Sequence, residues 1–247
     1  MNFDTFIMQV TPYKDSEQQK KQQVEQMFDN IAPKYDFLNH FLSLGIDKLW
    51  RKKAIRILSD YKSDYILDVA SGTGDFAIAA SRLNPGKVIG FDISEQMLVV
   101  GRQKVKELGL DKVIEFIKGD SEAMPFSDGQ FDAITVGFGV RNFENLDRGL
   151  KEFYRVLKDD GVVIVLEFSK PKNFPMKQLY FFYFFGILPL IGRLISKDSF
   201  AYSYLPESVM AFPDDQKFLS VLKNAGFSRT RQKRLSLGIA TIYIGQK

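Results

Sequence analysis

The sequence has no cysteine and a single histidine, His40, among its 247 residues. These absences exclude a disulfide framework, a zinc site built from thiolates, a cysteine nucleophile and a metal site built from several histidines. A Ser-His-Asp triad would need His40, and nothing around it resembles a nucleophile elbow. We therefore expect no resident metal, and we expect His40 to have a place at the surface or in a loop rather than in catalysis.

Long basic and long apolar runs are also missing. The 34 Lys and Arg residues only slightly outnumber the 30 Asp and Glu residues, and the densest basic stretch, residues 229–234, alternates with polar residues as the solvated face of a strand would. We therefore expect no nucleic-acid partner. The apolar patch at residues 6–10 is too short for a secretory signal, and the longest weakly polar run, residues 179–192, is shorter than the roughly 20 residues that cross a bilayer. The expected location is cytoplasmic.

Aromatic residues are abundant but unevenly placed. The chain has 23 Phe and 10 Tyr residues beside one Trp, and residues 174–212 hold eleven of these side chains, with six in succession at 180–185. Regular structure points consecutive side chains around a helix or to both faces of a strand, so six neighbouring rings cannot all face one core. Some of them are therefore expected at the surface.

The order of patterns along the chain indicates an α/β fold. Apolar residues have helical spacing at 24–31 and again after Asp47, a predicted N-cap. From residue 65, short β-branched runs alternate with helical stripes, which is typical of βα units on a parallel sheet. Strands are predicted near 65–70, 87–91, 113–117, 131–136, 162–167 and 239–244, and helices near 75–83, 94–108, 146–157 and 214–225.

A glycine turn joins the first predicted strand to the next helix. The run ILDVASGTGD at 66–75 places Gly72 and Gly74 between strand and helix, and Asp92 lies 18 residues beyond Gly74, near the place of a ribose-binding acid. This arrangement predicts a nucleotide site at the carboxyl ends of the strands. The simpler alternative is a turn that only connects strand and helix.

Two acids beside the turn bear on the choice of nucleotide. Asp68 precedes the turn, and Asp75 stands at the helix N-terminus, where the pyrophosphate of a dinucleotide would sit. Like charges so close weaken binding of a diphosphate. S-adenosyl-L-methionine has an ammonium and a sulfonium and no phosphate, so it is the predicted cofactor. A nicotinamide-dependent oxidoreductase is the alternative from another enzyme class.

The second and third strands are each followed by an acid. Asp92 is expected to accept both ribose hydroxyls, and Asp120 to accept from the adenine amino group with the backbone N–H of Ser121 beside it. The alternative for each acid is a helix cap.

The loop after the fourth strand also faces this crevice. Gly137 permits close approach of a ligand, and Arg141 and Asn142 point to the mouth of the crevice, where a methyl acceptor would lie. An ordinary loop with Asn142 or Asn145 capping the next helix is the alternative.

Five stretches of the chain carry a family resemblance. They are YDFLNHFLSLGIDKLW at 35–50, VASGTGDF at 69–76, GDSEAMPFSDGQFD at 119–132, GFGVRN at 137–142 and RVLKDDGVVIVLEFSKP at 155–171. In this order they resemble the ubiquinone/menaquinone biosynthesis C-methyltransferase family, and the first and last stretches are specific to it. The resemblance implies a class I, Rossmann-like methyltransferase fold with a mostly parallel seven-stranded sheet.

The resemblance also implies a reaction and a cofactor site. The reaction is methyl transfer from S-adenosyl-L-methionine to a ring carbon of a polyprenylated quinol: demethylmenaquinol in the last step of menaquinone biosynthesis, or a methoxy-benzoquinol in ubiquinone biosynthesis. Thr73, Asp92, Asp120 and Ser121 match the family's cofactor-contacting positions. The full predicted cofactor site is Asp68, Gly72, Thr73, Gly74, Asp92, Asp120, Ser121 and Gly137.

Such a reaction requires alignment of donor and acceptor and the loss of a proton from a ring hydroxyl. Arg141 is expected to stabilise the resulting phenolate and Asn142 to orient it, while Tyr35 or Asp36 relays the proton.

Three departures from the family pattern put only substrate detail in doubt. Leu38 stands where Met is usual, Asp47 where His is usual, and Asp159 with Asp160 where Pro-Gly is usual. We expect Asp47 at the surface and the Asp159–Asp160 pair in a turn before a strand, away from the adenosyl pocket.

The apolar tail of a polyprenylated quinol would explain the clustered aromatic residues. We expect it to form a hydrophobic entrance and a face that rests on the inner side of the membrane, with Lys177, Arg193 and Lys197 near anionic head groups. Internal packing or a homodimer contact is the alternative. The predicted single domain, 1–247, has a helical segment (1–60), cofactor-binding βα units (65–170), an aromatic insertion (172–212) and a terminal helix with strands (213–247).

Overall fold

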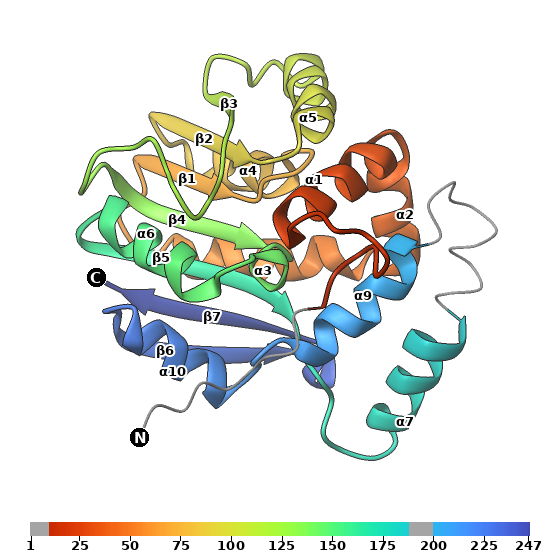
Figure 1. Ribbon diagram of the computed structural model, residues 1–247. Helices are drawn as coiled ribbons and strands as arrows, with labels where there is room; N and C mark the ends of the chain where they lie inside the picture. Colours follow the sequence, from red (N-terminus) through yellow and green to blue (C-terminus); the bar gives the residue numbers. More distant parts are fainter. Residues whose placement is uncertain (1–9, 188–199) are drawn as a thin grey trace.

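One seven-stranded sheet organises the chain (Figure 1). The structure is a computed structural model that describes residues 10–187 and 200–247. The strand order is β3-β2-β1-β4-β5-β7-β6, in which only β7 runs antiparallel to its neighbours. The strands are β1 (Tyr65–Val69), β2 (Lys87–Asp92), β3 (Ile114–Lys118), β4 (Phe131–Gly137), β5 (Leu157–Phe168), β6 (Ser228–Leu235) and β7 (Ala240–Gln246).

Helices cover both faces of the sheet. Alternate strand residues point to opposite faces, so each face needs its own apolar cover. Phe153 of α6 and Phe218 of α10 are fully buried on one face, and Leu58 of α3, Ala77 of α4 and Leu98 of α5 on the other. These helices are α3 (Ile46–Leu58), α4 (Asp75–Ala80), α5 (Glu95–Glu107), α6 (Leu146–Val156) and α10 (Gln216–Asn224).

The remaining helices gather where the parallel strands end (Figure 1). They are α1 (Lys20–Ile31), α2 (Tyr35–Leu42), α7 (Met176–Phe181), which continues into a π-helical turn at Phe182–Ile187, and α9 (Phe200–Ala211). Because α1 and α2 come from the N-terminal segment and α7 and α9 from the aromatic insertion, both segments are brought to the same edge of the sheet. No helix of the described ranges is long and apolar enough to cross a membrane.

The predicted fold class is confirmed, and two local predictions are wrong. The strand predicted at 162–167 begins at Leu157, which pairs with Phe131, and the chain then bulges before the pairing resumes. Asp160, with φ +63, lies in that bulge rather than in a turn before the strand. Asp47 is neither an N-cap nor at the surface: Gly45 precedes α3, and Asp47 is 1% exposed in its first turn.

Candidate active site

Two adjoining cavities open at the carboxyl edge of the sheet. The strand-end cavity, about 700 Å³, lies against the loops after β1 to β4, and its lining includes five predicted cofactor residues: Gly72, Asp92, Asp120, Ser121 and Gly137. The aromatic cavity, about 1420 Å³, lies between α1, α2, α3, α7 and α9. Phe28, Tyr35, Phe138 and Asn142 line both cavities. A ligand in one cavity is therefore next to a ligand in the other.

The glycine turn and Asp92 are tied together. Gly72, with φ +54, adopts a left-handed conformation that favours glycine. Its N–H donates to Oδ2 of Asp92 over 2.8 Å, and the Ser94 N–H donates to Oδ1 over 2.9 Å. Each carboxylate oxygen keeps a further lone pair for a ligand. Burial raises the pKa of Asp92 to about 6, although these two N–H groups oppose the shift.

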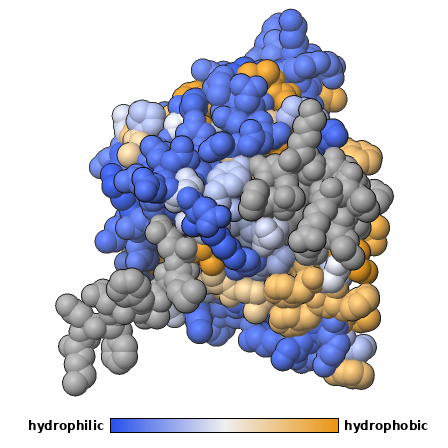
Figure 2. Space-filling model, turned by 45° about the vertical axis from the view of Figure 1, so that its right-hand side comes forward, coloured by the Kyte–Doolittle hydropathy of each residue, from blue (hydrophilic) through white to orange (hydrophobic). Residues whose placement is uncertain are grey.

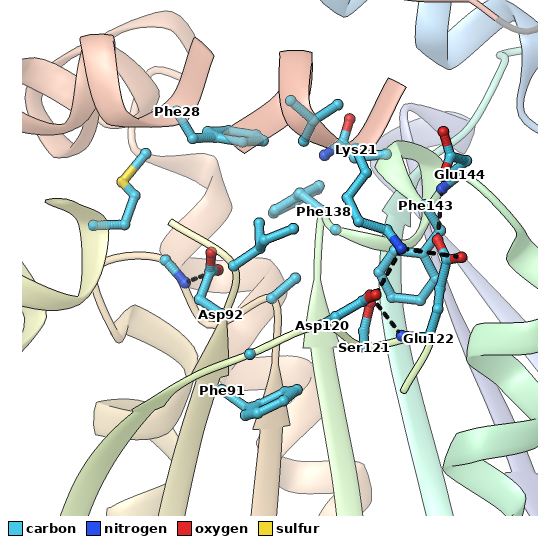
Figure 3. A pocket seen from close by; sticks show the side chains of 18 of the residues that line it. Lys21, Phe28, Phe91, Asp92, Asp120, Ser121, Glu122, Phe138, Phe143 and Glu144 are labelled. Carbon is cyan, nitrogen blue, oxygen red and sulfur yellow. Dashed lines mark hydrogen bonds and ion pairs between the residues drawn. The ribbon is translucent and has the colours of Figure 1, made fainter. Parts of the chain in front are cut away.

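Asp120 lies on the opposite wall of this cavity and has an unforeseen partner (Figure 3). Nζ of Lys21, from the first turn of α1, lies 2.6 Å from Oδ2 of Asp120 and 3.8 Å from Oε2 of Glu122. The Glu122 N–H donates to Oδ1 of Asp120. Lys21 therefore reaches across the cavity to the carboxylate that we predict to receive adenine.

The other three predicted cofactor residues do not line the cavity. Asp68 is fully buried beneath the turn, where it accepts from the Thr135 hydroxyl, and burial raises its pKa to about 7. Gly74, with φ +82, packs against Phe116 at the start of α4. Thr73 is buried, and its hydroxyl donates to Asp36.

Asp36 and Asp75 belong to an ion-pair network that fastens α2 and α3 to the glycine turn. Nζ of Lys104 lies 2.6 Å from Oδ2 of Asp36 and 2.7 Å from Oδ1 of Asp75, while Arg51 bridges Asp75 and Asp47. Burial by itself raises the pKa of Asp75, but Arg51 and Lys104 outweigh it and hold that pKa below its usual value. Asp75 is thus already paired with two cations, and the predicted repulsion between Asp75 and a diphosphate is wrong.

His40 also joins this network. It lies in α2, half-buried, and Nδ1 is 2.8 Å from Oδ2 of Asp47. Asp36 and His40 line neither cavity. In this arrangement Asp36 connects α2 to Lys104 of α5, and His40 connects α2 to Asp47 of α3.

Arg141 and Asn142 are held at the boundary of the two cavities by the loop after β4. Nη1 of Arg141 lies 2.8 Å from Oε1 of Glu167, a fully buried carboxylate on β5, and also donates to the carbonyl oxygen of Phe138. The guanidinium lies 5.5 Å from the centre of the Phe168 ring. Burial raises the pKa of Glu167, although Arg141 opposes the shift.

Polar atoms without partners point to a ligand at this boundary. Nε of Arg141 and Oδ1 of Asn142 are buried, and neither has a hydrogen-bond partner within the described part of the chain. A buried polar group without a partner is costly, so such groups are normally paired. Arg141 lines the aromatic cavity and Asn142 lines both, which places these free atoms where donor and acceptor would meet.

Tyr35 also lines both cavities. Burial raises the pKa of its phenol to about 12, despite the charges of Arg141 and Arg51. Near neutral pH the phenol of Tyr35 therefore keeps its proton, so it is able to donate a hydrogen bond.

Our reading of the sequence missed three charged residues of the site. Glu167 could have been predicted from the sequence, because it is the one charged residue within the apolar run of β5. Lys20 and Lys21 could not, since the polar stretch around them is typical of a solvated helix start. Lys20 donates to the carbonyl oxygens of Arg141 and Phe143, and burial lowers its pKa to about 8.

The residues of the strand-end cavity fit S-adenosyl-L-methionine. Carboxylate acceptors at Asp92 and Asp120 suit ribose hydroxyls and an adenine amino group, and Phe28, Ile93 and Met97 offer apolar cover for a base. Two more buried polar atoms, Oδ2 of Asp68 and Oγ of Ser71, lack partners in the described ranges beside the glycine turn. A sheet of this order with such a cavity defines a class I methyltransferase.

Comparison with known proteins gives the particular family. Residues 16–247 match the model of the ubiE/COQ5 methyltransferase family, and the chain belongs to that family. It is therefore a methyltransferase rather than an oxidoreductase. The chain is 52% identical over 239 residues to "Demethylmenaquinone methyltransferase" of Bacteroides fragilis, covering 96% of this chain and 97% of that protein.

Further relatives agree with this assignment. The chain is 41% identical over 247 residues to "Ubiquinone/menaquinone biosynthesis C-methyltransferase UbiE" of Geobacter sulfurreducens, covering 99% of this chain and 95% of that protein. Among solved structures, a SAM-dependent methyltransferase of Thermotoga maritima superposes with a TM-score of 0.65 at 20% identity, covering 90% of this chain and 99% of that one. At that identity the superposition supports the fold alone.

Proposed function

We propose that this methyltransferase transfers the methyl group of S-adenosyl-L-methionine to a ring carbon of a polyprenylated quinol, with demethylmenaquinol as the acceptor. The observation that carries the proposal is the apolar cavity of about 1420 Å³ that is lined by Arg141 and meets the strand-end cavity at Asn142. Relatives named demethylmenaquinone methyltransferase in Bacteroides fragilis and Porphyromonas gingivalis support the choice of acceptor.

When bound, the cofactor supplies a methyl group that is already activated on a sulfonium. The protein then has to orient the two partners, and near-attack alignment contributes much of the rate. Asp92 would hold the ribose, Asp120 and the Ser121 N–H the adenine, and Gly72 and Gly137 the close-packed wall. Asp68, Thr73 and Gly74 would support this wall from behind.

The acceptor carbon becomes nucleophilic when a neighbouring ring hydroxyl loses its proton, which passes to water. After the methyl group is transferred, the hydrogen on that carbon leaves as a proton and the ring oxygen regains one, so the ring is aromatic again and one proton is released overall. Arg141 would lower the pKa of that hydroxyl through its charge and donate from its free Nε, while Asn142 accepts through its free Oδ1. Tyr35 would donate a hydrogen bond to the oxygen of that ring hydroxyl. Asp36 is held by Lys104 and Thr73, so a role in proton relay requires those bonds to open.

The aromatic insertion would carry the polyprenyl tail and contact lipid. Its chain is divided between the interior and the surface: Tyr180 and Phe184 are 4% and 5% exposed, whereas Phe182 is 67% exposed. The predicted exposure of some rings is thus confirmed. Figure 2 shows apolar side chains gathered at the lower right of the view. The exposed large apolar residues between positions 174 and 187 are Phe174, Leu179, Phe182, Phe185 and Ile187, which we call the aromatic patch.

This patch favours association with the inner face of the membrane, since a large exposed apolar area marks a contact surface. Lys177 lies on α7 within it, whereas Arg193 and Lys197 lie outside the described residues. A contact between two copies of the chain is the competing use of the patch. We retain the proposal that residues 1–247 form one domain in which 172–212 serve substrate and membrane.

Purified protein with S-adenosyl-L-methionine and demethylmenaquinol in detergent micelles tests the function. We expect mass spectrometry to detect menaquinol, and a prenylated methoxy-benzoquinol in a parallel reaction distinguishes the ubiquinone alternative. Arg141→Ala should lower turnover far more than it lowers affinity for S-adenosylhomocysteine. Cofactor binding without product from either quinol would contradict the proposal.

A further inference from the structure

Two buried tyrosines of the aromatic insertion line the aromatic cavity, and their hydroxyl oxygens are buried without a hydrogen-bond partner in the described residues. Tyr180 lies on α7 and Tyr204 on α9, they are 4% and 3% exposed, and both line the cavity. Neither hydroxyl oxygen has a partner in residues 10–187 and 200–247. A buried hydroxyl without a partner costs stability, so two of them in one cavity call for a polar ligand.

Both rings are fixed in place by packing. Tyr180 stacks on Phe184 with 4.2 Å between ring centres and packs in one cluster with Val209. Tyr204 packs with Val24 and Met27 of α1 in a separate cluster. The two hydroxyls are therefore held by different walls of the cavity and are organised before any ligand arrives.

The chemical state of these hydroxyls suits donation. Burial raises the pKa of both phenols well above their usual range, with Arg141 opposing and Glu167 adding to the shift in each case. They therefore stay protonated near neutral pH. The same two charged residues act on both tyrosines, so both hydroxyls belong to the electrostatic surroundings of the Arg141 site.

We propose that Tyr180 and Tyr204 donate hydrogen bonds to the ring oxygens of the quinol and make the aromatic cavity specific for an oxygenated ring rather than for any apolar molecule. The proposal rests on the proposed function and deepens it. The cavity otherwise offers mostly apolar walls, and its remaining free polar atoms, Nε of Arg141 and Oδ1 of Asn142, lie at the cofactor boundary. A quinol has two ring oxygens, and four free polar atoms in one cavity match such a ligand.

The variants Tyr180→Phe, Tyr204→Phe and their combination test the proposal. We expect each single change to lower kcat/KM for demethylmenaquinol about tenfold, the effect of losing one hydrogen bond, with S-adenosylhomocysteine affinity unchanged. Because the lost hydroxyl has no partner in the free protein, Tm should stay constant or rise by about 2–4 °C.

Tyr243→Phe is the matched control. Tyr243 is a fully buried tyrosine outside both cavities, and its hydroxyl accepts from the Asp215 N–H over 2.8 Å. Its removal should lower Tm by about 2–4 °C and leave kcat/KM unchanged. The cavity variants should thus lose kcat/KM without losing Tm, whereas the control should lose Tm without losing kcat/KM.

Prenylated naphthols that carry only one of the two hydroxyls provide a second measurement. One of the two naphthols lacks the hydroxyl that activates the acceptor carbon, so binding is measured instead of turnover. If a tyrosine donates to one ring oxygen, its replacement by Phe should weaken binding only of the compounds that keep that oxygen. Losses of kcat/KM within twofold of the wild type for Tyr180→Phe and Tyr204→Phe, or equal losses of binding with every compound, would overturn the inference. Absence of methyl transfer by the wild-type protein would instead overturn the proposed function.

Discussion

Glu167→Gln tests whether a buried carboxylate holds Arg141 in position. Oε1 of Glu167 lies 2.8 Å from Nη1 of Arg141, and their side chains are 0% and 9% exposed. Gln keeps the volume and an acceptor oxygen but removes the charge. Breaking a buried ion pair by neutralising one partner costs about 3–5 kcal/mol. Arg141 keeps its bond to the Phe138 carbonyl, so we expect about 3 kcal/mol, which lowers Tm by roughly 6–12 °C.

The effect on catalysis should be larger than the effect on cofactor binding. A displacement of about 1 Å at a reacting centre lowers the rate about 100-fold. The loss of the Glu167 charge weakens the contact that fixes the Arg141 guanidinium and allows such a displacement. We therefore expect kcat to fall about 100-fold in Glu167→Gln. Glu167 lines neither cavity, so affinity for S-adenosylhomocysteine should stay within twofold.

A double-mutant cycle with Arg141→Ala is the assay. If Glu167 acts through Arg141, the double variant is no less active than Arg141→Ala alone. Losses in kcat/KM that multiply would refute this reasoning. Asp132→Asn is the matched control: Oδ1 of Asp132 is 2.8 Å from Nζ of Lys158, and Asp132 lines neither cavity. It should lower Tm without lowering kcat.

Three further outcomes are expected. The pKa of Asp92 is raised to about 6, and only its carboxylate accepts from two ribose hydroxyls. Affinity for S-adenosylhomocysteine should therefore fall as pH drops below about 6, and calorimetry should show no such dependence in Asp92→Asn. Lys21→Met removes a competitor for Asp120 and should tighten the binding of S-adenosylhomocysteine by up to about fivefold, the range of an ion pair near the surface. Weaker binding would show that Lys21 instead holds Asp120 in the position that binds the cofactor. Replacing Phe182 and Phe185 by Ser should release the protein from anionic liposomes in sedimentation, and unchanged binding would exclude the aromatic patch as the lipid contact.

The fold could be predicted because its signals are local. A βα unit repeats within about thirty residues, and the apolar runs of β1 and β4 show the period of buried strands. The wrong predictions, for the start of α3 and the course of β5, concern positions where backbone conformation rather than apolar periodicity determines the structure. The left-handed conformations of Gly45 and Asp160 move the start of α3 and the course of β5, and no apolar pattern reports them.

The strand-end cavity was also accessible to sequence reasoning, for a topological reason. Parallel strands all end at one edge, so residues placed just after consecutive strands converge there. Gly72, Asp92, Asp120 and Ser121 obey this rule. Asp68 does not, because it lies one pleat before the strand end, and its side chain points beneath the glycine turn to Thr135. The cofactor roles of these residues remain predictions.

Contacts supplied by the N-terminal helices follow no such rule. Lys104 meets Asp36 across 68 positions of sequence, and Lys21 meets Asp120 across 99. A charged residue on an amphipathic helix has the same sequence signature whether its partner is water or a distant carboxylate. Only the placement of α1 and α2 over the strand ends decides which applies.

The composition of the aromatic insertion predicts its apolar surface but not the buried hydroxyl of Tyr180. The run at 180–185 indicates apolar surface, and Phe182 and Phe185 provide it. Hydropathy treats Tyr180 as one more apolar residue of that run, yet Tyr180 lines the aromatic cavity and its buried hydroxyl has no partner among the residues that the structure describes. Because an unsatisfied hydroxyl reduces the stability of the free protein, it is accounted for only if a bound molecule satisfies it. An insertion that merely covered a prenyl tail would be served as well by Phe at 180, so the hydroxyl itself argues for recognition of an oxygenated ring.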